Sequence, residues 1–244
     1  MKKRANLIIV ILAILFLIGV SSLVYRFFIW QPEAIWDESP DSVIIASDPG
    51  CIEMDIDYIP YVQIWGDGRI IWIEYNINGE RTVWEGNLTH SEIKQLIERL
   101  IRMDFFKFWH GYNEYCAGKF LTVRLSDISS RRMIVSQNSK FVELYNFLAT
   151  GAGTKGKEFV PTQGLLYAYP IEETELPADT EATFVWPEDE FGYNLEELYT
   201  QKNGRSISGE EIRFAWEIVN SPFAVVESNG KVYWIGIRLP GIST

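Results

Sequence analysis

The chain has 244 residues and a formal net charge of −11, and 47% of its residues are apolar. Four of the 22 basic residues and none of the 33 acidic residues lie in the first 30 positions, which leaves a formal charge of −15 on the remainder. A surface this acidic repels phosphate backbones and excludes nucleic acid as an expected partner, whereas the apolar content suffices for one large core or two small ones.

The first predicted element is an uncharged apolar stretch without proline, Leu7–Val24. As a helix its 18 residues span about 27 Å, close to the roughly 30 Å of a bilayer's hydrocarbon core. Basic residues at positions 2–4 precede it, which predicts a cytoplasmic N-terminus. We therefore predict a single-pass protein of the cell membrane, with residues 1–30 as basic tip and transmembrane helix and the bulk of the chain extracytoplasmic. Cleavage of a signal peptide after Ser22 is the alternative.

The remainder divides by composition into three parts. Residues 31–42 contain two prolines and four acids and predict a spacer. Residues 43–150 and 158–240 each combine apolar strand patterns with helical ones, and the glycine-rich stretch 151–156 between them predicts a linker. We predict an α+β fold of two subdomains, in which antiparallel β-sheets pack with three short amphipathic helices.

Two of these helices have a sequence signal for their N-terminus. Thr89 and Glu92 fit a capping box, and apolar residues follow at helical spacing. Ser208 and Glu211 fit a second capping box before another apolar stripe. The third helix is predicted near residues 141–148, and a closing hairpin is predicted around the turn Asn229-Gly230.

The Gly66-Asp67-Gly68 segment lies between two apolar runs and predicts a β-hairpin. With Asp67-Gly68 as a two-residue loop, Val62 pairs with Ile73 and an aliphatic face forms the core. The opposite face then holds four residues that form a candidate ligand surface for a sugar ring or an apolar peptide, namely Tyr61, Trp65, Trp72 and Glu74. The alternative, which we favour, is that a second layer of the same protein covers this face.

The chain has two cysteines, Cys51 and Cys116. In an exported protein such a pair predicts a disulfide, with two free buried thiols as the alternative. Their separation excludes a CxxC redox motif, and one pair with two distant histidines makes a poor zinc site. We predict no metal and no cofactor.

Catalytic signals are weak. The loop 110–118 contains His110 and Cys116, but this spacing matches no nucleophilic motif. Capped helices and turns explain most other polar residues. We therefore predict a membrane-anchored extracytoplasmic binding or sensing module without an evident catalytic site, whose partners are the membrane and a protein or glycan ligand. The alternative is an exported hydrolase of carbohydrate or peptidoglycan that uses acids such as Glu114 or Asp189.

A resemblance covers roughly residues 51–136. The Gly66-Asp67-Gly68-Arg69 hairpin, the GNLTHSEI helix start and the DFF helix exit make this region similar to uncharacterised domain-of-unknown-function proteins exported by bacteria. In the proteins that this region resembles, a cysteine precedes the hairpin, as Cys51 does here, and a strand follows the helix, as residues 119–126 do here. The resemblance implies a bacterial source and an interaction module, and it brings no catalytic residue.

Overall fold

A computed structural model describes residues 12, 14–22, 25, 30–50, 59–107, 117–134, 139–171, 184–201, 204–222 and 224–242. Cys51, Cys116 and Glu114 lie outside these residues, so the disulfide and the proposed role of Glu114 stay predictions. Among the described residues, no helix has both the length and the apolar character needed to cross a membrane.

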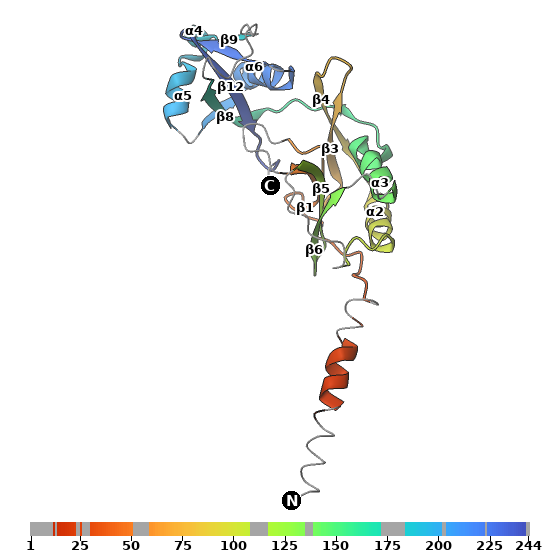
Figure 1. Ribbon diagram of the computed structural model, residues 1–244. Helices are drawn as coiled ribbons and strands as arrows, with labels where there is room; N and C mark the ends of the chain where they lie inside the picture. The colour runs from red at the N-terminus through yellow and green to blue at the C-terminus, as the bar shows by residue number, and fades with distance from the viewer. Residues whose placement is uncertain are drawn as a thin grey trace, which may run out of the picture.

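The predicted α+β class with antiparallel sheets is confirmed (Figure 1). The first sheet is antiparallel throughout, in the order β6-β5-β1-β2-β3-β4-β7. Its strands are β1 (Val43–Gly50), β2 (Val62–Trp65), β3 (Arg69–Tyr75), β4 (Arg81–Asn87), β5 (Ala117–Arg124), β6 (Ser129–Ile134) and β7 (Lys157–Glu158).

The second sheet has the order β10-β8-β12-β11-β9, and only its β9–β11 pair is parallel. Its strands are β8 (Gln163–Pro170), β9 (Phe184–Val185), β10 (Arg205–Ser208), β11 (Val226–Ser228) and β12 (Lys231–Arg238). The β11–β12 hairpin turns through Asn229-Gly230 as predicted, with Ser228 paired to Lys231 and both turn residues at positive φ.

The three predicted amphipathic helices are α2 (His90–Arg102), α3 (Ser139–Ala149) and α6 (Gly209–Asn220), and α4 (Glu188–Phe191) and α5 (Leu195–Gln201) are shorter. The first capping box is confirmed, because the Glu92 N–H donates to Thr89 Oγ1 and the Thr89 N–H donates to Glu92 Oε2. The second is wrong, since the Ser208 side chain makes no cap hydrogen bond. Ser208 is the last residue of β10 and pairs with Gln163.

The predicted register of the first hairpin is wrong by one residue. Val62 pairs with Trp72 and Ile64 with Ile70, which leaves Gly66-Asp67-Gly68 as a three-residue loop. Gly68 has φ +98°, as the bulge position of such a loop requires. Because side chains alternate along a strand, this slip moves Trp72 to the face opposite Trp65.

Both faces of the first sheet are buried. On one face Val62, Ile64, Ile70 and Trp72 join a cluster with residues of α2 and α3. On the other face Trp65, Ile71, Ile73 and Val83 join a cluster with residues of the second sheet, α5 and α6. The second half of the chain therefore packs against one face of the first sheet, on the side away from α2 and α3 (Figure 1).

The segments predicted as spacer and linker also contact the fold. Trp36 is buried, and its Nε1 donates to the Gly66 carbonyl at 3.1 Å, so the end of the predicted spacer packs on the first hairpin. An added Cβ at Gly151 or Gly156 would lie 2.7 or 2.4 Å from Trp72. Because these two glycines have no side chain, the predicted linker can pass close over the Trp72 ring before β7 joins the first sheet.

Candidate functional site

The four residues of the predicted ligand surface do not form one exposed platform. Trp65 and Trp72 are 1% and 3% exposed and lie on opposite faces of the sheet. Trp72 stacks on Trp84 with ring centroids 6.5 Å apart and donates from Nε1 to Glu74. Tyr61 is half-buried, 6.4 Å from the ring of Tyr75. The two tryptophans are packing residues, in agreement with the alternative that other layers cover them.

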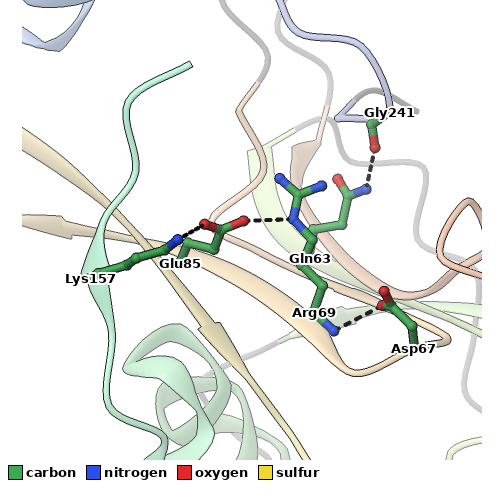
Figure 2. A network of polar contacts seen from close by, with 6 residues as sticks. All are labelled: Gln63, Asp67, Arg69, Glu85, Lys157 and Gly241. Atoms are coloured by element: carbon green, nitrogen blue, oxygen red, sulfur yellow. Dashed lines mark hydrogen bonds and ion pairs between the residues drawn. The ribbon is translucent and has the colours of Figure 1, made fainter. Parts of the chain in front are cut away.

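A row of three charged side chains crosses β3, β4 and β7 on the face that packs against the second half of the chain. Arg69 begins β3, and Glu85 on β4 lies directly opposite Lys157 on β7. The Arg69 Nε donates to Glu85 Oε1 at 2.8 Å, and Lys157 Nζ lies 3.2 Å from Glu85 Oε2 (Figure 2). One carboxylate is thus shared by two cations.

The Arg69 guanidinium is held from several sides. Its Cζ lies 4.5 Å from the ring centroid of Trp65 and 5.8 Å from that of Phe159, both within cation–π range. The Arg69 backbone N–H donates to Asp67 Oδ1 at 3.0 Å, which fixes the start of the strand. Its Nε is taken by Glu85, and its two Nη nitrogens have no hydrogen-bond partner among the described residues. The Nη edge is therefore available to a ligand oxygen.

The two cations also set the protonation state of Glu85. Partial burial by itself would raise the pKa of the Glu85 carboxyl, but the hydrogen bonds from Arg69 and Lys157 outweigh this effect and hold its pKa below the ordinary value. Glu85 therefore stays ionised at neutral pH. It serves as an anchor for the two cations rather than as a proton donor.

A hollow of about 360 Å³ opens at this row, which we call the Arg69 pocket. Its charged wall consists of Arg69, Glu85, Lys157 and Glu158. Its apolar wall comes from residues 159–161, 239, 240 and 242, and Thr162 and Gln163 complete the lining. An adjoining hollow of about 550 Å³ borders Arg69, Glu85 and Lys157 as well and adds Asp67 and Lys155. The pocket thus lies where the two halves of the chain meet.

The C-terminal wall of the pocket is tied to the first sheet. Gln63 is buried on the same face as Arg69, and its Nε2 donates to the Gly241 carbonyl at 3.2 Å (Figure 2). Leu239 and Ile242 form an isolated β-bridge and belong to the cluster under Trp65. These contacts hold the wall in place before any ligand arrives.

Chemically, this arrangement suits the binding of an oxyanion. A guanidinium edge with two free N–H groups matches the two oxygens of a carboxylate or phosphate. The carboxylates of Glu85 and Glu158 balance the charges of Arg69 and Lys157 on this wall, so the geometry of the guanidinium rather than a net positive charge would hold an oxyanion. Within the described part of the chain, no group of three or more His, Cys, Asp or Glu residues is placed to hold a metal ion.

No local pattern in the sequence predicts this pocket. The register supplies the missing signal, because Ile71 pairs with Glu85 and places that carboxylate diagonally across from Arg69. The pairing of β7 with β4 depends on residues more than 70 positions apart, which no local pattern reveals.

An exposed aromatic face does exist, but on the second sheet. Trp234 lies directly opposite Tyr169 and is 41% exposed, and the Arg238 guanidinium lies 5.4 Å from the ring centroid of Tyr167. None of these four residues belongs to either apolar cluster. We call them the outer aromatic face. It lies on the side of β8 and β12 opposite their buried residues.

Asp189, considered for hydrolysis, lies in the acidic run Glu188-Asp189-Glu190 on α4. Glu188 accepts a hydrogen bond from the Ser228 hydroxyl at 2.6 Å, and that hydroxyl accepts from the Leu195 N–H at 3.0 Å. Ser228 is buried, so this chain of bonds fixes the start of α5. Asp189 is exposed, and its use in hydrolysis stays a prediction.

Comparison with family models, with curated proteins and with solved structures gave no significant match for this chain.

Proposed function

We propose that this protein is a membrane-anchored extracytoplasmic binding module whose ligand presents an oxyanion to Arg69. One observation carries the proposal. Arg69 is oriented by Glu85, Trp65 and Phe159, yet its Nη edge has no partner among the described residues and borders a hollow. A guanidinium fixed in this way is pre-organised for a carboxylate or phosphate, which lowers the entropy lost on binding.

The membrane anchor in this proposal rests on the apolar stretch Leu7–Val24. The structure adds one supporting observation: residues 14–22 are helical, and their large apolar side chains are all exposed, among them Phe16 at 71% and Leu17 at 62%. An apolar helix surface exposed on all sides is unfavourable in water and favourable in a lipid environment. The basic residues at positions 2–4 orient the N-terminus toward the cytoplasm.

An extracytoplasmic location also implies an oxidising environment for Cys51 and Cys116. Both cysteines lie outside the described residues. Their described neighbours support a bridge, because Gly50 at the end of β1 pairs with Ala117 at the start of β5. We propose a disulfide between the two cysteines. Unreduced protein should then resist a thiol reagent after denaturation, whereas labelling of both thiols would remove this part of the proposal.

The binding proposal is tested with the full chain in nanodiscs, using acetate and inorganic phosphate as separate probes. Saturation-transfer NMR for acetate and phosphorus line broadening for phosphate report binding to the protein. Because a small anion makes few contacts, we expect Kd values in the millimolar range. Arg69→Gln keeps a side chain of similar polarity without the charged fork and should weaken binding at least tenfold.

Arg238→Gln is the matched control. Arg238 also lies against an aromatic ring, that of Tyr167, but it belongs to the outer aromatic face and borders neither hollow. Arg238→Gln should therefore bind both probes as the wild type does. Equal binding by the wild type and Arg69→Gln, or equal losses in the two variants, would exclude the Arg69 pocket as the binding site.

A further inference from the structure

We propose that the ligand of the Arg69 pocket is an amphipathic monoanion, with a carboxylate on Arg69 and an apolar body against residues 159–161, 239, 240 and 242. This inference rests on the proposed binding function and adds the chemical class of the ligand. It comes from the division of one small hollow into a charged wall and an apolar wall.

The apolar wall has two parts that are distant in the sequence. The connection between β7 and β8 contributes Phe159, Val160 and Pro161, and the C-terminal segment contributes Leu239, Pro240 and Ile242. Val160 is 46% exposed, which makes it one of the few large aliphatic side chains after position 30 that face solvent among the described residues. An apolar group placed in the hollow would remove part of this surface from water.

Both parts of the wall are held against the first sheet. The Phe159 N–H donates to the Val83 carbonyl at 2.8 Å, and the Gly241 carbonyl accepts from Gln63. Phe159 also packs edge-on against Trp216 of α6, with ring centroids 5.9 Å apart. The hollow is therefore preformed, and little ordering of protein groups opposes binding.

The charges on the wall limit the ligand to one negative charge. Arg69 and Lys157 contribute two positive charges, and Glu85 and Glu158 contribute two negative ones. A ligand with several negative charges would meet the two carboxylates, whereas one carboxylate can take the Nη edge of Arg69 and leave Glu85 with Lys157. The volume of about 360 Å³ suits a small molecule rather than a folded partner.

The test uses a series of linear carboxylates that share one head group, namely acetate, butanoate and hexanoate. Each methylene that is fully buried should tighten binding about fourfold, since its transfer from water contributes about 0.8 kcal/mol. With partial burial we expect hexanoate to bind the full chain in nanodiscs at least tenfold more tightly than acetate. Empty nanodiscs measure the uptake of hexanoate by lipid.

Three variants separate the contribution of the carboxylate head group from that of the apolar wall. Arg69→Gln should weaken acetate and hexanoate alike, because both lose the same head-group contact. Val160→Ser should reduce the ratio of acetate Kd to hexanoate Kd several-fold. Val185→Ser should leave that ratio unchanged, because Val185 is 67% exposed on β9 and borders none of these walls.

The results distinguish failure of the inference from failure of the proposed function. If all three carboxylates bind with equal Kd and all depend on Arg69, the ligand is an anion without an apolar body, and only the inference is wrong. If hexanoate binds more tightly but Val160→Ser leaves the ratio unchanged, the apolar wall is not the contact, and the inference again is wrong. If no binding depends on Arg69, both proposals are wrong.

Discussion

The two sheets of this protein differ in how many faces they bury. In the first sheet, all four residues of β2 and the central residues 70–73 of β3 are buried, because helices cover one face and the second half of the chain covers the other. In the second sheet, buried and more exposed residues alternate through most of β8. A substitution on the first sheet therefore disturbs a core whichever way its side chain points, whereas the second sheet has one face that tolerates change.

The largest expected effect is that of Trp72→Ala, matched with Trp234→Ala. Trp72 is buried in the apolar cluster that includes residues of α2 and α3, so its truncation should lower the free energy of unfolding by about 3–5 kcal/mol. Trp234 lies on the outer aromatic face, and its truncation should lower that free energy by less than about 1 kcal/mol. Denaturant unfolding of the purified full chain measures both. Similar losses of unfolding free energy in the two variants would show that the two sheets do not differ in the number of faces they bury.

The loops of the two hairpins offer a second comparison. An ideal Cβ at Gly66 would lie 1.8 Å from the Asp37 carbonyl oxygen, so Gly66→Ala forces the backbone apart and should cost about 1–3 kcal/mol. At Gly230 an added Cβ meets no atom within 4 Å, and only the positive φ of +71° opposes it, at about 1 kcal/mol. Thermal unfolding ranks the two variants. A more damaging Gly230→Ala would show that segment 36–42 does not clamp the first loop.

A third prediction concerns alkaline pH and the second half of the chain. Burial, together with the hydrogen bond from the Tyr193 hydroxyl to Glu211, raises the pKa of Tyr193. The folded state then binds this proton more tightly than the unfolded state, so the resulting stability is complete below about pH 10 and is lost as the pH rises above it. Tyr193→Phe should cost about 1.5 kcal/mol at pH 7 and progressively less above pH 10. If the difference in unfolding free energy between the wild type and Tyr193→Phe stays constant up to pH 11, this linkage is excluded.

The smallest expected effect is that of Glu85→Gln, matched with Glu227→Gln. The pKa of Glu85 is lowered in the folded state, so its ion pairs stabilise the protein above its unfolded pKa, and this contribution is lost as the pH falls through the folded pKa. Because its partners are partly exposed, we expect a cost of about 1 kcal/mol at pH 7 that disappears in acid. Glu227 is exposed on β11, and Glu227→Gln should change the free energy of unfolding by less than about 0.5 kcal/mol. Unfolding curves at pH 7 and pH 3 decide between these outcomes.

Local signals in the sequence predicted the elements that short-range contacts decide. Thr89 and Glu92 cap α2 through bonds that span three residues, and Asn229-Gly230 closes its hairpin because both residues tolerate positive φ. The same reasoning failed at Ser208, where pairing with β8 holds the residue in a strand and its hydroxyl caps nothing. The local preference of a residue prevails only where contacts with distant parts of the chain do not compete with it.

The first hairpin shows what tertiary structure decided. Asp67-Gly68 carries the sequence of a two-residue turn, yet the Gly66 N–H donates to the Ser42 carbonyl and its carbonyl accepts from Trp36, which draws Gly66 into the loop. This slip of one residue separates Trp72 from Trp65. The pairings of β4 with β3 and with β7 line up Arg69, Glu85 and Lys157. The sequence by itself determined several of the strands, the capped helix α2 and the apolar N-terminal stretch. The pocket was decided by strand pairing across long separations, because its energy comes from contacts that form only when the chain is folded.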